Sequence, residues 1–431
     1  MSKARRPIAL TALALTGALL LAACGSSGGG AQGDGKTLKL WHYEAPDSAM
    51  GVAWNQAIAE FKKTHPGVKV EFEAKGFEQI QKTASMVLNS HDAPDVMEYN
   101  KGNATAGLLA KQGLLTDLTP QVTKYGWDKL LSPSVTTTSK YNAQGVMGSG
   151  QWYGVPNFGE YTMVYYNKDL FRRNGVKVPT TPAEFTAALA AFKAKGITPL
   201  ADAGAEYPAQ QYFYQLALTR ADRAWVDSFQ LYRGKADFHD PAWTYAADTF
   251  ADWVSKGYIA KTSSSAKAED AGVSFINGKY PIFFSGSWWY GRFKTENKFS
   301  WGTFLWPGTT LTPGSGGNLW VVPKNAKNKQ LAYDFIDITM KKQVQNTLGN
   351  NGGVPVAADP SAITDPASKQ LIENFDHVSG SDGLAFYPDW PVPGFYDVMV
   401  SAVQKLITGS AKPGDVLDQL QKAYDEGVPA S

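Results

Sequence analysis

The sequence predicts an α/β protein made of two bodies. Two observations predict this: strand and helix patterns alternate between residues 38 and 99, and a second alternation begins after residue 155. The order strand, helix, strand, helix, strand is typical of a parallel or mixed sheet covered by helices. The chain has 431 residues, which is enough for two or three domains with large cores. We find no internal repeat.

The first alternation is clear in the spacing of apolar residues. Apolar and polar side chains alternate over 38–43, as in a strand, and Trp54, Ile58 and Phe61 are spaced for one face of a helix. Pro66-Gly67 ends this helix. We then expect a strand over 68–74, a helix over 77–88 and a strand over 95–99.

The second alternation starts with a strand predicted over 162–166. Thr181-Pro182-Ala183-Glu184 is a strong helix start, because a hydroxyl cap is followed by proline and, three residues on, by glutamate. That helix should end near residue 194. Further helices are expected over 208–219, 241–256, 265–276, 328–348, 366–375, 394–408 and 414–425, and strands over 280–284, 302–305 and 319–322.

The N-terminal segment has the layout of a secretory signal. A basic start is followed by an apolar run over 8–21, about fourteen residues and too short to span a bilayer as a helix. The run closes on Leu21-Ala22-Ala23-Cys24, which resembles a bacterial lipobox. We therefore predict a lipoprotein signal peptide over 1–23 and lipidation of Cys24, followed by a flexible Gly/Ser linker over 24–35. The alternative is an ordinary signal with a cysteine near the cut.

Composition excludes several kinds of site. Removal of the signal would leave a formal charge of about −1, whereas nucleic-acid partners usually require a basic face. Cys24 is the only cysteine, so disulfides and thiolate metal sites are excluded. No two of the five histidines have the spacing of metal ligands on one helix face. We expect no nucleic-acid partner, no metal and no cofactor.

Aromatic residues are numerous, with 13 Trp, 20 Tyr and 21 Phe. Most should be core, but several lie beside glycine or proline in turn-rich segments, where rings offer flat surfaces to a ligand. These segments are Trp152-Tyr153-Gly154, Trp288-Trp289-Tyr290 and Asp389-Trp390-Pro391. A glycosidase would need two carboxylates across a sugar bond. The nearby pairs Glu71/Glu73 and Asp92/Asp95 fit a strand surface and a turn better.

Four segments occur in a characteristic order. They are YGVP at 153–156 leading to VYYNKDLF at 164–171, FINGK at 275–279 with FSGSW at 284–288, GGNLWVVP at 316–323 with a helix at 332–336, and the stretch 395–409 with DVL at 415–417. In this order they resemble the family 1 extracellular solute-binding proteins of bacterial ABC importers, the relatives of maltose-binding protein. The likeness covers essentially the whole chain from residue 36.

The resemblance implies a two-lobed periplasmic-binding-protein type II fold with a hinge and an interlobe cleft. Lobe 1 would take residues 36–155 and 317–365, and lobe 2 residues 156–316 and 366–431. The implied protein is a monomeric, exported and lipid-anchored sugar receptor that is not an enzyme. Its partners would be a di- or oligosaccharide, the membrane and the transmembrane subunits of an ABC permease. A lipid-anchored glycoside hydrolase and a receptor for a non-sugar solute remain open.

The resemblance also implies cleft residues. Glu160 matches a carboxylate that accepts sugar hydroxyls, and Trp288 and Tyr396 match stacking rings. The remaining implied contacts are His42, Tyr43 and Glu44 after the first strand, Tyr99 and Asn100 after the third, and Gly317 and Asn318. Two departures bear on the exact sugar: the last ring is tyrosine instead of tryptophan, and the loop after Tyr99 has Lys101 and Gly102 instead of the usual acidic residue. Each side chain can alternatively belong to the core or the surface.

Overall fold

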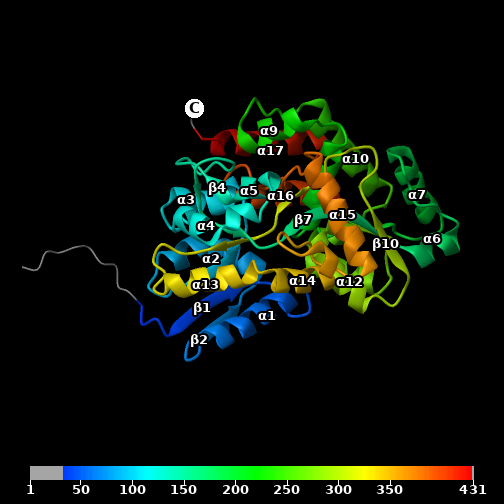
Figure 1. Cartoon of the computed structure of the whole chain (residues 1–431). Helices are drawn as coiled ribbons and strands as arrows, with labels where there is room; N and C mark the ends of the chain where they lie inside the picture. Colours follow the sequence, from blue (N-terminus) through cyan, green and yellow to red (C-terminus); the bar gives the residue numbers. More distant parts are fainter. Residues whose placement is uncertain (1–32, 430–431) are drawn as a thin grey trace, which may run out of the picture. The chain divides into compact units, whose positions relative to one another are not determined.

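The computed structural model describes residues 33–429, and the chain from Gly33 onward forms one compact unit. The predicted signal peptide and Cys24 lie outside the described residues. Two mixed sheets organise the described part, and helices cover both (Figure 1). Within residues 33–429, no helix combines the length and the apolar character that a membrane crossing requires.

The first sheet has the strand order β2-β1-β3-β12-β6. Its strands are β1 (Thr37–His42), β2 (Lys69–Ala74), β3 (Val96–Tyr99), β12 (Leu319–Val321) and β6 (Val155–Pro156). The first three run parallel, and β12 is inserted antiparallel between β3 and β6. On one face, α1 (Ala49–Thr64) packs against α13 (Lys329–Thr339) and α14 (Lys342–Asn350), which lie beside it in Figure 1.

The second sheet has the order β10-β7-β9-β8. Its strands are β7 (Gly159–Asn167), β8 (Leu200–Ala201), β9 (Ile282–Gly286) and β10 (Trp301–Phe304), and β11 (Gly314–Gly316) pairs with the start of β7. The central strand β7 is buried at nearly every position, which is typical of a strand covered on both faces. The helices α8 (Tyr207–Leu218), α10 (Pro241–Ser255), α16 (Phe395–Thr408) and α17 (Pro413–Gly427) pack together against this part of the molecule.

Two short segments cross side by side from one sheet to the other. Residues 157–158 join β6 to β7, and residues 317–318 join β11 to β12. The backbone N–H of Gly317 donates to the Phe158 carbonyl over 2.5 Å, and that of Asn157 donates to the Asn318 carbonyl over 3.1 Å. A Cβ on Gly317 would lie 2.6 Å from the Phe158 oxygen, so only glycine allows this approach. A third connection, 351–365, leads from α14 to α15 (Pro366–Gly380).

The predicted alternation of strands and helices is confirmed, with one clear error. The helix expected over 328–348 is two helices, α13 and α14, separated at Met340–Lys341. The remaining elements are α2 (Phe77–Leu88), α3 (Leu108–Lys111), α4 (Thr119–Tyr125), α5 (Pro133–Thr136), α6 (Lys168–Asn174), α7 (Pro182–Ala194), α9 (Arg223–Leu231), α11 (Ala268–Ile276), α12 (Tyr290–Glu296), β4 (Lys140–Tyr141) and β5 (Gln151–Trp152). The exact lobe boundaries stay a prediction.

Candidate functional site

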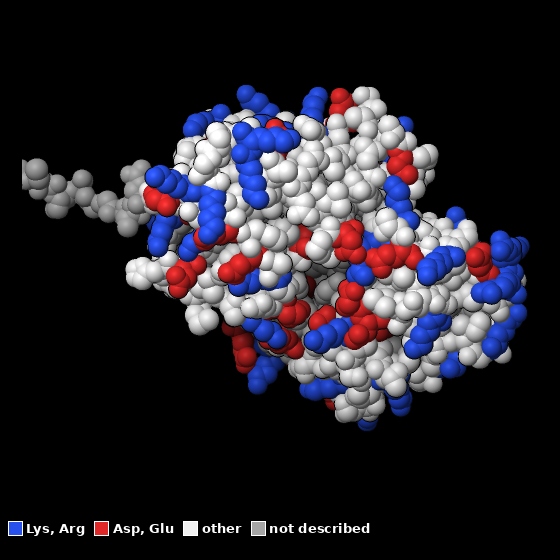
Figure 2. All heavy atoms as spheres, turned by 90° about the horizontal axis from the view of Figure 1, so that it is seen from below, with Lys and Arg blue, Asp and Glu red and all other residues white. Residues whose placement is uncertain are grey.

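A cavity of about 570 Å³ is lined by segments from both sheets. This volume lies in the range of roughly 300–1,000 Å³ that small-molecule sites occupy. Figure 2 shows a hollow on one face of the molecule with Asp and Glu side chains gathered around it. The lining comprises Tyr43, Glu44, Ala45, Ser48, Gly76, Phe77, Glu78, Asn100, Lys101, Phe158, Glu160, Glu206, Tyr207, Gln211, Lys267, Ala268, Glu269, Trp288, Trp289, Arg292, Asn318, Tyr387, Asp389, Trp390 and Tyr396.

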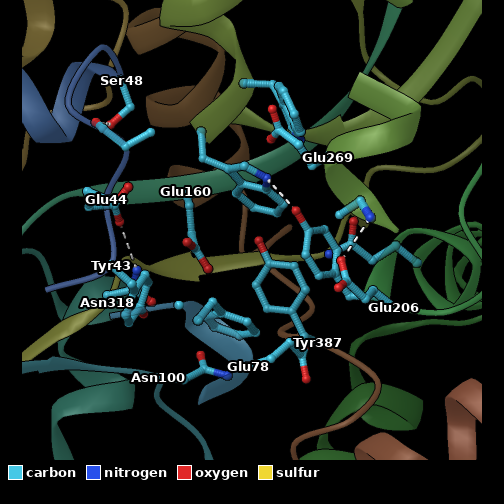
Figure 3. Close-up of a pocket in the computed structure, with 18 of the residues that line it drawn as sticks. Tyr43, Glu44, Ser48, Glu78, Asn100, Glu160, Glu206, Glu269, Asn318 and Tyr387 are labelled. Carbon is cyan, nitrogen blue, oxygen red and sulfur yellow. Dashed lines mark hydrogen bonds between the residues drawn. The ribbon is translucent and has the colours of Figure 1, made fainter. Parts of the chain in front are cut away.

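Most side chains that the sequence suggested meet in this cavity. They come from turns that follow β1, β3 and β9, from the start of β7, from the second crossover and from the first turn of α16. These residues are Tyr43, Glu44, Asn100, Glu160, Trp288, Asn318 and Tyr396. Figure 3 shows Glu44, Glu160, Asn318 and Tyr387 around the same space.

His42, Tyr99 and Gly317 are not among the lining residues. His42 is the last residue of β1 and shares the buried face of Leu38 and Leu40; its ring stacks on Phe72 at 4.3 Å, and burial lowers its pKa to about 4. Tyr99 is 3 % exposed and belongs to the hydrophobic core. Gly317 is fixed against the first crossover. For each of these three residues, the next residue along the chain lines the cavity instead, namely Tyr43, Asn100 and Asn318.

A buried polar network forms the cavity floor. Lys101 Nζ lies 2.5 Å from Glu160 Oε1 and donates to Asn318 Oδ1 over 3.1 Å. The Asn318 amide in turn donates to Glu44 Oε1 over 3.4 Å. The side chains of Lys101 and Glu160 are 3 % and 5 % exposed. We call Lys101, Glu160, Asn318 and Glu44 the floor network.

A third carboxylate, beside the two of the floor network, lies next to that network without lining the cavity. Glu98, in β3, is fully buried and accepts a hydrogen bond of 2.9 Å from the amide of Asn157 in the first crossover. Burial raises the pKa of Glu98 to about 7. The charge of Glu98 also contributes to the raised pKa of Glu44, although burial of Glu44 is the larger cause. Glu98 therefore links the first sheet to the crossover through a group that titrates near neutral pH.

Acidic residues at the cavity are placed at the starts of helices. Glu78 is in the first turn of α2, Glu206 precedes α8, and Glu269 is in the first turn of α11. The positive end of a helix dipole stabilises a carboxylate there. Burial nevertheless raises the pKa of Glu78, and it raises the pKa of Asp389 to about 7. The cavity is thus lined by several carboxyl groups. Burial favours the protonated, uncharged form of two of them, Glu78 and Asp389.

Aromatic rings form the walls. Trp288 donates its indole N–H to the Tyr207 hydroxyl over 3.3 Å, and the two rings meet edge to face. Tyr387 packs against Trp288 and Trp390. The hydroxyls of Tyr43 and Tyr387 and the amide oxygen of Gln211 have no hydrogen-bond partner among the described residues. Buried polar groups are normally paired, so this wall suits a ligand with both flat apolar faces and hydroxyls.

Four half-buried side chains from opposite sides of the cavity contact one another. The Tyr396 hydroxyl, at the start of α16, donates to Glu78 Oε1 over 2.6 Å. The Phe77 ring, beside Glu78, meets the Tyr207 ring edge to face. We call Phe77, Glu78, Tyr207 and Tyr396 the mouth contacts. They join α2, which borders the first sheet, to α8 and α16 near the second.

Lys101, Tyr207 and Tyr387 are site residues that sequence reasoning missed. In the sequence, Lys101 stands out only because its loop lacks the acidic residue that the family resemblance implies. Tyr387 lies three residues before Trp390, within a turn-rich stretch whose aromatics were recognised as possible ligand surfaces. Among residues 33–429, no group of three or more His, Cys, Asp or Glu residues could hold a metal ion.

Comparison with known proteins identifies the family. The family model for bacterial extracellular solute-binding protein matches residues 45–345. The chain belongs to this family. The resemblance inferred from the sequence is therefore confirmed, and family membership makes the protein a solute-binding protein.

Individual relatives agree with this assignment. The chain is 25% identical over 364 residues to the diacetylchitobiose binding protein DasA of Streptomyces coelicolor, covering 80% of each chain. It is 25% identical over 354 residues to the multiple sugar-binding protein of Streptococcus mutans, covering 79% of each. The solved structure of a chitin oligosaccharide binding protein matches with a TM-score of 0.76 at 24% identity, covering 92% of this chain and 99% of the other. The predicted two-lobed fold is confirmed.

Proposed function

We propose that this protein is the sugar-binding component of a bacterial ABC importer. The observation that carries the proposal is the cavity wall, which combines aromatic rings with buried polar groups that have no partner among the described residues. A sugar has C–H faces that stack on rings and hydroxyls that reach carboxylates and amides. Stacking contributes roughly 0.5–1.5 kcal/mol per ring, and a hydrogen bond to a charged group about 1.5–3 kcal/mol.

In this proposal each cleft residue has a role. Trp288 and Tyr396 stack on sugar rings, and Glu160, Asn318, Glu44 and Asn100 bind hydroxyls. Tyr43 and Tyr387 donate their hydroxyl hydrogens to sugar oxygens. The names of relatives support an oligosaccharide ligand, since they include a diacetylchitobiose receptor and a chitin oligosaccharide receptor.

Closure of the hinge would couple binding to delivery. With lobes at residues 36–155 plus 317–365 and 156–316 plus 366–431, the lining residues fall on both, so a ligand makes all its contacts only in the closed form. Binding then shifts the open–closed equilibrium toward closure. The closed form would dock on the permease as a monomer. In this role the protein releases its sugar unchanged, and prolonged incubation with a bound oligosaccharide should give no cleavage product by mass spectrometry.

A thermal-shift screen of the full chain tests the proposed ligand class. Diacetylchitobiose, maltose, cellobiose and xylobiose would each be added over a range of concentrations. A true ligand raises the melting temperature by mass action, with about 2.7 kcal/mol of stabilisation at a hundred times Kd. Calorimetric titration should give the same ranking. No shift with any saccharide, together with a shift for an amino acid or peptide, would contradict the proposal.

We further propose that Cys24 carries a lipid anchor on the outer face of the cell membrane. The lipobox-like sequence and the Gly/Ser stretch after it support this. In cells fed labelled palmitate, the wild-type protein should incorporate label and sediment with membranes. Replacing Cys24 with serine should abolish both. Equal membrane retention of the two proteins would count against an anchor at this residue.

A further inference from the structure

The ammonium group of Lys101 is surrounded by groups that bind cations. It lies 2.5 Å from a Glu160 oxygen and 3.1 Å from the Asn318 amide oxygen. The same nitrogen lies 5.4 Å from the centre of the Trp390 ring and 5.7 Å from that of Tyr387. A carboxylate, an amide oxygen and two aromatic faces are the chemistry by which proteins recognise ammonium groups. We call Glu160, Asn318, Tyr387 and Trp390 the ammonium cage.

The cage is buried, yet it borders the ligand cavity. Lys101 and all four cage residues line the cavity, and the Lys101 and Glu160 side chains are at most 5 % exposed. A buried carboxylate without a counter-charge is costly, so this cage requires a cation. Lys101 supplies that cation from within the chain. Its stem enters from the turn after β3, whereas Glu160 comes from the start of β7 and Asn318 from the second crossover.

We propose that Lys101 determines the specificity of the cleft by filling the ammonium cage. Its tethered ammonium excludes a basic amino group of a ligand from the floor, and it holds Glu160 in the orientation that receives a sugar hydroxyl. The cleft therefore selects saccharides that are uncharged at this position. The statement about saccharides rests on the proposed function; the statement about the cage does not.

Competition explains the selectivity. An amino sugar that entered the floor would place its ammonium beside that of Lys101, and like charges disfavour such a complex. Other carboxylates of the cavity, among them Glu44 and Asp389, could instead attract an amino sugar. If the wild type bound the amino form more tightly, the attraction of these carboxylates would exceed the repulsion by Lys101. The proposed specificity role of Lys101 would then be wrong. Lys101 touches no reacting or transported atom in this account and acts as a positioning residue through Glu160.

Replacement of Lys101 by alanine tests the cage without any sugar. The variant should melt at a lower temperature than the wild type, and propylammonium chloride should raise its melting temperature in a saturable manner. Propanol at the same concentrations should not. Lys267→Ala is the matched control, because Lys267 also lines the cavity but is exposed and forms no ion pair among the described residues. Equal responses of both variants to propylammonium would overturn the cage.

Calorimetry with two related saccharides tests the selectivity. Diacetylchitobiose is neutral, and its deacetylated form carries basic amines. We expect the wild type to bind the neutral form at least tenfold more tightly, and Lys101→Ala to lose tenfold for that form and to reverse the preference. A Lys101→Ala variant that keeps the wild-type preference would refute the specificity role. If the wild type binds neither form nor any saccharide of the thermal-shift screen, the proposed function fails, whereas the propylammonium result still decides the cage.

A double variant separates positioning from a merely structural contribution. Lys101→Met keeps the apolar stem but leaves Glu160 unpaired, and Lys101→Met with Glu160→Gln removes both charges. Stability should recover in the double variant, while saccharide affinity should stay at least tenfold below wild type. In a Glu160→Gln background, Lys101→Met should change affinity less than twofold. Independent, additive losses in affinity would show that Lys101 does not act through Glu160.

Discussion

The floor network and the mouth contacts of the cavity differ in how deeply their side chains are buried. In the floor network Lys101, Glu160 and Asn318 are buried beside the two crossovers, and the side chains of Lys101 and Glu160 are at most 5 % exposed. The mouth contacts join helices that approach from opposite sides, and Tyr396 and Glu78 are only half-buried. Removing one partner of a buried ion pair leaves an uncompensated charge, so substitutions in the floor network should cost more stability than substitutions at the half-buried mouth contacts.

From this difference we expect the floor network to determine ligand choice and the mouth contacts to determine how readily the cleft opens. A hinge protein must break some contacts each time it opens, and half-exposed contacts can be exchanged for water at small cost. The floor network is built on strand ends and on the second crossover, whereas the mouth contacts are built on the first turns of helices. We therefore expect floor substitutions to change stability and ligand choice, and mouth substitutions to change mainly the open–closed balance.

The largest effect is expected from Glu98→Gln beneath the floor. Burial raises the pKa of Glu98 from 4.5 to about 7, so the folded state binds more protons than the unfolded state between these pH values. Its contribution to the free energy of unfolding is fully present below about pH 4.5 and is lost as the pH rises to about 7. Glutamine does not titrate. We therefore compare how far the free energy of unfolding, measured with urea, falls between pH 5 and 8 in each protein. The fall should be about 2–3 kcal/mol smaller for Glu98→Gln than for the wild type.

Glu426→Gln is the control for this measurement. Glu426 is an exposed residue of α17, and its side chain is 68% exposed. Its replacement should leave the pH dependence of unfolding unchanged. If Glu98→Gln and wild type lose stability in parallel, Glu98 does not carry the proton and the floor is better solvated than its burial indicates.

The second-largest effect is expected from Trp288→Ala in the aromatic wall of the cavity. Trp288→Ala removes the ring that packs over Gly286, where no Cβ would fit, and contacts Tyr207 and Tyr387. Calorimetry should show saccharide affinity at least tenfold lower, because a stacking surface is lost. Trp288→Phe should retain most of the affinity. Unchanged affinity for Trp288→Ala, with normal urea unfolding, would exclude this ring from the binding site.

The sequence predicted the fold because its signals are local. Alternation over 38–43, apolar spacing in the following helix and the cap at Thr181 each report on a few neighbouring residues, and the structure has elements there. The break between α13 and α14 was missed, since apolar residues continue across Met340. Both helices pack against α1, a contact between distant segments that no local pattern records.

The candidate site was predictable only where a turn could be matched to the family. Tyr43 and Glu44 line the cavity as expected, whereas His42 does not, because alternation along β1 turns its side chain toward the face of Leu40. Lys101 and Glu160 are 59 positions apart, and their contact depends on how the turn after β3 lies against the start of β7. Tyr387 lies in an irregular stretch between α15 and α16, where periodicity gives no information.

A smaller effect is expected from the mouth variant Tyr396→Phe. It removes the hydroxyl that donates to Glu78 but keeps the ring. In the partly solvated mouth this bond contributes roughly 0.5–1.5 kcal/mol, so saccharide affinity should fall two- to tenfold while the free energy of unfolding changes little. X-ray scattering of the unliganded variant should show a larger radius of gyration than that of the wild type. Identical scattering would mean that this contact does not hold the mouth closed.

The smallest effect is expected from Glu269→Gln at the rim. Glu269 pairs with Arg292 at 2.9 Å, but its side chain is 62% exposed, and Arg292 keeps a second partner in Glu296 at 2.8 Å. Exposed ion pairs contribute about 0–1 kcal/mol, so saccharide affinity should change less than twofold and urea unfolding by less than about 1 kcal/mol. Glu296→Gln is the matched control on the same arginine. If Glu269→Gln alone weakened binding as much as Trp288→Ala, the rim would contact the ligand directly, and recognition could no longer be assigned to the floor and walls.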